Sequence, residues 1–178
     1  LMIPVAASAQ YNVDRLVTSG RVAVYYEDYI LGIQYFNQAL ALKPYLWEPW
    51  QLRAIAKFNL DDFRGAELDA SEAIRLNPYI VQLYDLRGIS RIRQDDFVGA
   101  IADYNKAIKL QPTSQNYWYN RAICRFEMKD YEQTHLDLDT IIRRWSKFVS
   151  PYLLKADVFL QQHDTLAAAE WIGKSLDI

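Results

Sequence analysis

The strongest constraint on this chain is a self-similarity that recurs every 34 residues. The segment from Val81 to Pro112 aligns with residues 47–78 when it is shifted 34 positions towards the N-terminus, and with residues 115–146 when it is shifted 34 positions towards the C-terminus. A fixed period of this length is typical of proteins built by stacking one supersecondary unit many times. The sequence therefore predicts an array of repeats.

The array contains five repeats, which begin at Val13, Trp47, Val81, Gln115 and Val149. Their ranges are 13–46, 47–80, 81–114, 115–148 and 149–178. Large apolar or aromatic residues occupy the fourth position of each repeat: Leu16, Trp50, Tyr84, Trp118 and Tyr152. Small residues occupy the eighth position: Gly20, Ala54, Gly88, Ala122 and Ala156. The twentieth position is also small: Gly32, Ala66, Ala100, Thr134 and Ala168.

Each repeat is predicted to be a pair of antiparallel helices. Apolar residues recur at three- and four-residue spacing in both halves, which places them on one helical face. A polar turn separates the halves, and in it Asp62, Asp96 and Asp130 are positioned to cap the second helix. One such pair cannot bury its apolar face alone, so successive pairs are expected to stack.

These columns resemble the tetratricopeptide repeat, with its bulky fourth position, small eighth and twentieth positions, aromatic twenty-fourth position and closing proline. Phe36 and Tyr104 match the twenty-fourth position, whereas Ala70, Leu138 and Ile172 depart from it. Prolines close the first three repeats (Pro44, Pro78 and Pro112), and Ser146 stands where a fourth proline is expected. The resemblance implies an all-α fold, a right-handed superhelical α-solenoid of helix-turn-helix repeats.

Composition restricts the partners that we expect. The net charge is −2 and charged residues make up 24% of the chain, so no long-range attraction to nucleic acid is expected. No stretch approaches the ~20 apolar residues of a membrane span. The single cysteine, Cys124, lies at a small position of a predicted helix, where we expect a buried and unreactive thiol.

The ends of the chain depart from the repeat. Residues 1–9 carry no charge and end in Ala7-Ser8-Ala9, which resembles the end of a secretory signal peptide with its cleavage site before Gln10. The alternative is an apolar arm that packs on the first helix. At the other end, either the chain continues into a longer protein or Ile172 and Leu176 face a partner, and we favour the longer protein. The domain prediction is thus a signal-peptide remnant at 1–9 and a repeat array at 10–178.

A column of basic residues runs through the first helices at the seventh position: Arg53, Arg87, Arg121 and Lys155. A carboxylate follows each arginine sixteen residues later, at Asp69, Asp103 and Asp137. In the first repeat both are missing, since Ser19 and Tyr35 occupy these positions. We therefore predict a repeated Arg–Asp pair between the two helices. A track for anionic ligands is the alternative interpretation.

The resemblance also implies that a peptide binds along the concave surface of the first helices. Its predicted residues are Gln51, Ile55, Phe58, Asp85, Ile89, Ile92, Tyr119, Ile123 and Phe126. The alternative is that some of these side chains belong to the ordinary core. The carboxylate clamp of the chaperone-binding members is absent, because in every window of three repeats only Asn120 falls on a matching position.

Signals for catalysis are poor. His135 and His163 lie in different repeats, and neither has a spacing that completes a metal site. The chain contains no glycine-rich phosphate loop and no nucleophile motif. The pairs Asp61-Asp62 and Asp95-Asp96 recur at helix starts, where capping explains them. We expect no enzymatic activity, cofactor, metal or small-molecule substrate.

The sequence thus favours a protein–protein interaction scaffold of the exported bacterial type, located in the periplasm or secreted into the cell envelope. Two alternatives remain: a structural spacer for a domain beyond residue 178, and a cytosolic adaptor or regulator.

Overall fold

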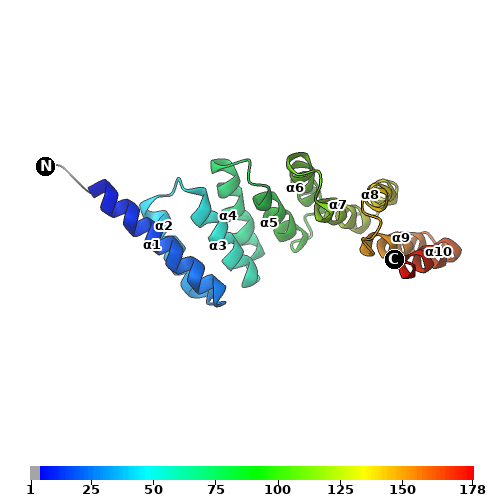
Figure 1. Ribbon diagram of the computed structural model, residues 1–178, viewed down its shortest axis with the longest axis horizontal. Coiled ribbons are helices and arrows are strands. Elements are labelled where there is room, and N and C mark those ends of the chain that lie inside the picture. The colour runs from blue at the N-terminus through cyan, green and yellow to red at the C-terminus, as the bar shows by residue number, and fades with distance from the viewer. Residues whose placement is uncertain (1–4) are drawn as a thin grey trace. The chain divides into compact units, whose positions relative to one another are not determined.

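The computed structural model describes residues 5–178, which form ten helices and no strand (Figure 1). The first helix of each repeat is α1 (Val5–Tyr25), α3 (Trp47–Asn59), α5 (Val81–Ile92), α7 (Gln115–Glu127) and α9 (Ser150–Gln161). The second helix is α2 (Tyr29–Leu42), α4 (Phe63–Leu76), α6 (Phe97–Leu110), α8 (Tyr131–Arg144) and α10 (Thr165–Leu176). The prediction of an all-α chain is confirmed.

The turn inside each repeat has one conserved geometry along the chain. An aspartate side chain accepts a hydrogen bond from the backbone N–H three residues later and so caps the second helix: Asp28, Asp62, Asp96, Asp130 and Asp164. The residue before each aspartate has a left-handed backbone, with φ between 59° and 63°. The capping role predicted for Asp62, Asp96 and Asp130 is confirmed.

Small residues allow the paired helices to approach each other closely. A Cβ atom on Gly20 of α1 would collide with the ring of Phe36 on α2, and both of these residues are buried. In the second repeat Ala54 and Ala66 are fully buried at the eighth and twentieth positions. The small columns in the sequence therefore mark helix–helix contact.

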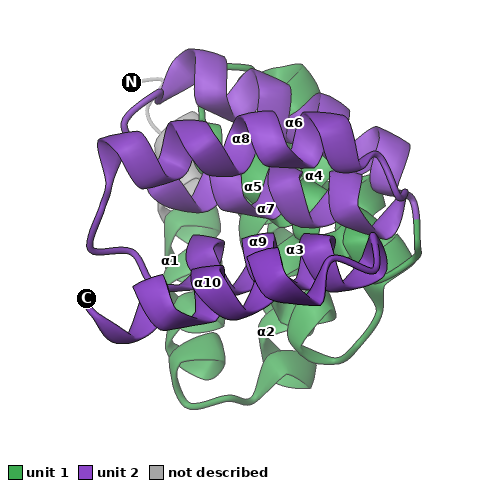
Figure 2. Cartoon of the chain, turned by 90° about the vertical axis from the view of Figure 1, so that its right-hand side faces the viewer, with its two compact units in different colours: residues 1–95 green, residues 96–178 purple. Residues whose placement is uncertain are grey.

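The chain divides into two compact units (Figure 2). The first extends to Asp95 and contains α1 to α5, and the second begins at Asp96 and contains α6 to α10. Within each compact unit every helix packs against the next one along the chain. The division falls in the turn of the third repeat, so it does not follow the 34-residue boundaries.

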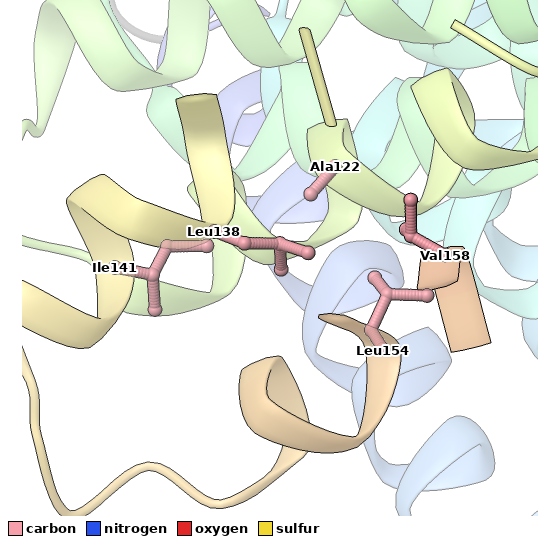
Figure 3. Packing of buried hydrophobic residues seen from close by; sticks show 5 residues of the cluster. All are labelled: Ala122, Leu138, Ile141, Leu154 and Val158. Carbon is pink, nitrogen blue, oxygen red and sulfur yellow. The ribbon is translucent and has the colours of Figure 1, made fainter. Parts of the chain in front are cut away.

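The core of the second compact unit is clearest where three helices meet (Figure 3). Ala122 of α7, Leu138 and Ile141 of α8, and Leu154 and Val158 of α9 point toward one another and are buried. Partly buried aromatic side chains surround them, among them Trp118 and Trp145. This cluster joins the fourth repeat to the fifth.

The expected signal-peptide remnant, residues 1–9, is described only in part. Residues 1–4 of that segment lie outside the described residues, and residues 5–9 form the first turns of α1. The location of the protein therefore stays a prediction. In the part of the chain that the structure describes, no helix is long and apolar enough to cross a membrane.

Candidate functional site

The nine predicted groove residues lie on three first helices, three residues on each. All nine are half-buried. Gln51, Ile55 and Phe58 lie on α3, and Asp85, Ile89 and Ile92 lie on α5, which packs beside α3 in the first compact unit. Tyr119, Ile123 and Phe126 lie on α7 in the second compact unit. Their four- and three-residue spacing places the three residues of each helix on one face.

On α7 the groove residues also belong to the core. Tyr119, Ile123 and Phe126 pack against the cluster formed by α7, α8 and α9. The Tyr119 ring contacts Phe148 edge to face, with 5.2 Å between ring centroids. The pKa of the Tyr119 phenol is raised, mainly by burial. The charge of Asp157 raises it further, and a hydrogen bond with Ser150 opposes the shift. These three side chains therefore contribute to stability whatever they bind.

Asp85 is the polar exception on the apolar face of α5. Its Oδ1 atom is buried, and no hydrogen-bond donor among the described residues reaches it. Burial raises the pKa of this carboxyl group, because an ionised carboxylate loses its hydration without gaining a partner. An unsatisfied oxygen of this kind is costly in an unliganded protein and is a natural acceptor for a ligand donor.

The basic column forms the predicted interhelix pairs. Arg53 binds Asp69 through two hydrogen bonds, from Nε to Oδ2 and from Nη2 to Oδ1, each 2.7 Å long. Arg121 binds Asp137 in the same bidentate way, at 3.0 and 2.6 Å. Both carboxylates are buried, at 4% side-chain exposure. The prediction is confirmed in these two repeats, whereas the Arg87–Asp103 pair, which would join the two compact units, stays a prediction.

A second cation reaches each of these carboxylates. Lys57 Nζ lies 2.9 Å from Asp69, and Arg125 Nη1 lies 2.6 Å from Asp137. Both cations occupy the eleventh position of their repeats, one helical turn after the seventh. The buried aspartate is thus the centre of a three-residue cluster, which gives the charges of the column structural partners.

The sequence interpretation missed a further acceptor, which comes from the preceding repeat. Arg53 donates to Asn37 at 2.6 Å, Arg87 to Ser71 at 3.1 Å and Arg121 to Asn105 at 2.5 Å, and Lys155 contacts Asp139. Each acceptor lies sixteen residues before its cation, at the twenty-fifth position. In the sequence, the small polar residues at the twenty-fifth positions could have indicated these contacts. These partners leave little support for an anion track.

The remaining chemical groups have structural explanations. Cys124 is fully buried, and desolvation raises the pKa of its thiol to about 12. His135 packs on the Phe159 ring, with 4.9 Å between ring centroids. Within the described residues, no group of three or more histidine, cysteine, aspartate or glutamate residues could hold a metal ion.

Comparison with known proteins identifies the type of repeat. The tetratricopeptide repeat family model matches residues 103–135. The solved structure of MamA (41-end) from Desulfovibrio magneticus RS-1 is similar, with a TM-score of 0.87 at 13% identity, over 93% of this chain and 94% of that one. YrrB, described as a TPR protein with an unusual peptide-binding site, is similar with a TM-score of 0.82 at 10% identity, over 91% of this chain and 84% of that one.

A shorter match is the first TPR domain of Spaghetti bound to an HSP90 peptide. Its TM-score is 0.64 at 23% identity, over 66% of this chain and 94% of that one. No curated protein matches the chain in sequence. The structural similarities confirm the all-α solenoid fold of tetratricopeptide repeats.

Proposed function

We propose that this chain, which belongs to the tetratricopeptide repeat family, is an interaction scaffold that holds a peptide or protein partner along the inner face of its first helices. The observation that carries the proposal is the surface shared by α3 and α5. Ile55 and Phe58 on α3 and Ile89 and Ile92 on α5 are half-buried, so each keeps apolar area that a partner can cover. Asp85, on the same face of α5, has a buried oxygen without a protein donor.

This arrangement suggests the chemistry of the partner. Apolar side chains at helical spacing suit an extended or helical peptide with hydrophobic anchors. The Asp85 oxygen adds a preference for a donor, such as an amide N–H or a basic side chain, between those anchors. Two structural neighbours, YrrB and the TPR domain of Spaghetti, are described by their peptide-binding site or bound peptide, which is consistent with the proposal.

Affinity capture with matched variants tests the groove. The 178-residue chain and its Ile89→Glu variant are used to capture proteins from cell-envelope extract, with Leu68→Glu as the control. Leu68 lies on the second helix α4 and is 62% exposed, so its substitution changes charge equally without touching the groove. We expect a partner that the wild type and Leu68→Glu retain and that Ile89→Glu loses, with unchanged helical circular dichroism.

Other outcomes of this capture would contradict the proposal. If Ile89→Glu retains the partner as well as the wild type does, the partner binds another surface. If Ile89→Glu unfolds, Ile89 belongs to the core and not to the groove. If no variant captures anything, the spacer interpretation becomes the better one.

We further propose that the protein acts outside the cytoplasm. The support is the uncharged segment that ends in Ala7-Ser8-Ala9, which resembles a cleavage site for secretion. Mass spectrometry of the protein isolated from cell fractions tests this directly. A first residue of Gln10 in the envelope fraction supports export, whereas a cytosolic protein that retains Leu1 contradicts it.

A further inference from the structure

The turn that closes the fourth repeat differs in charge from the equivalent turns of the first three. At the thirtieth and thirty-third positions the first three repeats carry leucine and an uncharged residue, respectively: Leu42, Leu76 and Leu110, and Tyr45, Tyr79 and Thr113. The fourth repeat carries Arg144 and Lys147 at these positions, and Ser146 replaces the closing proline between them. The other repeats form their helix pairs without these two charges, so the fold does not require them.

The backbone of this turn is fixed from two sides. The Trp145 N–H donates to the Ile141 carbonyl at 2.7 Å, and the Phe148 N–H donates to the Trp145 carbonyl at 2.9 Å. From α9, the Tyr152 hydroxyl donates to the Ser146 carbonyl at 3.0 Å. The side chains of Trp145 and Phe148 also pack against the buried cluster of α7, α8 and α9. The turn therefore holds its side chains on a rigid frame.

A pocket of about 480 Å³ lies beside the turn. Its lining comes from the first residue of α7, the last residue of α8 and the turn itself: Gln115, Arg144, Trp145, Ser146, Lys147 and Phe148. All of these residues belong to the second compact unit. The two cations can only donate hydrogen bonds, the amide and the hydroxyl can donate as well, and no carboxylate is present. We call this site the closing-turn pocket.

The two cations of the closing-turn pocket have no carboxylate partner. At the seventh position of the same compact unit, each cation pairs with a carboxylate: Arg121 and Lys155. Neither Arg144 nor Lys147 forms such a pair within the described residues. Arg144 instead lies over the Trp118 ring, 5.2 Å from its centroid, which holds the guanidinium without neutralising its charge.

The surrounding sequence is also free of negative charge. Residues 140–156 contain four cations and no aspartate or glutamate, and the first turns of α7 and α9 contain no acidic residue. The local potential at the pocket is therefore positive, although the whole chain has a net charge of −2.

This chemistry fits one class of anion. A phosphate monoester carries a charge of about −1.5 to −2 at pH 7, which two unpaired cations can neutralise, whereas a carboxylate carries one charge. The guanidinium of Arg144 can bind two phosphate oxygens at once, and the ammonium of Lys147 acts as a point charge beside it. The partly buried side chains of Trp145 and Phe148 offer apolar contact to the group that carries the phosphate.

We propose that the closing-turn pocket binds a phosphate monoester, with Arg144 and Lys147 on its oxygens and with Trp145 and Phe148 against the group that carries it. The phosphate comes either from a phosphorylated side chain of a partner protein or from a free phosphorylated metabolite, because both present this chemistry. The pocket uses none of the proposed groove residues of α3 and α5, so this binding goes beyond the proposed function.

Isothermal titration calorimetry of the 178-residue chain at low ionic strength tests the pocket. The phosphorylated probes are inorganic phosphate, free phosphoserine and a five-residue peptide with one phosphoserine between alanines. The comparison probes are the same peptide with unphosphorylated serine and the same peptide with glutamate at that place. These probes separate the two sources of the phosphate and distinguish a phosphate from a carboxylate.

Two variants give each cation the residue that the third repeat has at the equivalent position, Arg144→Leu and Lys147→Thr. Because the third repeat folds with these residues, both variants are expected to keep their helical circular dichroism. Arg143→Leu is the matched control. Arg143 is exposed and lies in the same last turn of α8, but it does not line the pocket.

We expect the wild type and Arg143→Leu to bind the phosphorylated probes with equal Kd. Arg144→Leu and Lys147→Thr should each bind them at least about tenfold more weakly, because each loses one charge-assisted contact. The glutamate peptide should bind more weakly than the phosphoserine peptide, and the serine peptide should not bind. Tighter binding of the phosphoserine peptide than of free phosphoserine indicates a side chain of a partner, and the reverse order indicates a metabolite.

Four outcomes would overturn the proposal. In the first, the wild type shows no saturable binding of any phosphorylated probe. In the second, Arg143→Leu loses as much affinity as Arg144→Leu, which indicates a diffuse positive field. In the third, the glutamate peptide binds as tightly as the phosphoserine peptide. In the fourth, a single-stranded oligothymidylate binds more tightly than every monoester, which indicates a nucleic acid.

The groove variant Ile89→Glu separates this proposal from the proposed function. It is expected to bind the phosphorylated probes like the wild type, because Ile89 lies on α5 in the first compact unit and does not line the pocket. Conversely, Arg144→Leu is expected to retain a partner that binds the groove. Failure of one proposal therefore leaves the other open to its own test.

Discussion

The buried aspartates Asp69 and Asp137, at the twenty-third position of their repeats, each bind two cations. Asp69 and Asp137 each accept a bidentate arginine and lie within 2.9 Å of a second cation. Neighbouring tryptophan rings also cover the arginines, with Arg53 4.7 Å from the centroid of Trp50 and Arg121 4.9 Å from that of Trp118. Removing the carboxylate would leave two cations in a largely desolvated place.

We therefore expect Asp137→Ala to lower the free energy of unfolding by about 1–3 kcal/mol, the cost of leaving buried charged donors unpaired. Urea denaturation followed by circular dichroism measures the loss. The control is Glu170→Ala, which removes an exposed i,i+4 pair with Lys174 and is expected to change stability by less than about 0.5 kcal/mol. Equal losses in both variants would mean that the Asp137 cluster is effectively solvated. The same substitution at Asp103 would test the pair predicted there.

The Asp85 carboxyl group should make stability depend on pH. Its pKa is raised in the folded protein by burial, so its contribution to stability is present below the unfolded pKa and is lost as pH rises through the folded pKa. Asp85→Asn removes this dependence, and it should be more stable than wild type at pH 7 while the difference shrinks towards pH 4. Thermal denaturation of both proteins at the two pH values measures it. If the two proteins differ in stability by the same amount at both pH values, the raised pKa of Asp85 is contradicted.

At the scale of elements, helix ends and helix contacts have different origins. Each second helix begins at a capping aspartate, which is a local interaction within four residues. Contacts between helices depend on buried side chains such as Leu138, which connects α7, α8 and α9. The aromatic residue expected at that position is replaced by leucine without loss of burial.

Leu138→Ala is expected to lower the free energy of unfolding by about 2–5 kcal/mol, because it leaves a cavity where three helices meet. The matched control on the same helix is Leu136→Ala, whose side chain is 55% exposed and whose loss should cost less than about 0.5 kcal/mol. Denaturant titration of both variants provides the comparison. A small loss for Leu138→Ala would show that the neighbouring helices collapse to fill the space.

At the scale of the whole molecule, the chain contains two compact units, and each repeat packs against its neighbours in sequence. Stability in such an array is a sum of local terms and nearest-neighbour terms. A substitution in one compact unit should therefore leave distant repeats nearly unaffected, unlike in a globular domain with a single core.

Hydrogen exchange of Leu138→Ala tests this expectation. Amides of α7 to α9 should exchange faster than in wild type, whereas those of α1 to α4 should keep their protection, because they belong to the other compact unit. Uniform loss of protection over all ten helices would indicate that the chain unfolds as one cooperative unit.

The sequence by itself determined the repeat, the helix pairs, the capping aspartates and the Arg–Asp pairs of the second and fourth repeats. Each of these depends on spacing within one repeat, and a fixed period makes such spacing visible. Tertiary structure alone decided which groove residues also belong to the core, that Asp85 has a buried oxygen without a donor, and that Arg121 shares its guanidinium with Asn105 of the preceding repeat. These outcomes depend on which helices surround a side chain, and the position of a residue within the repeat does not specify that.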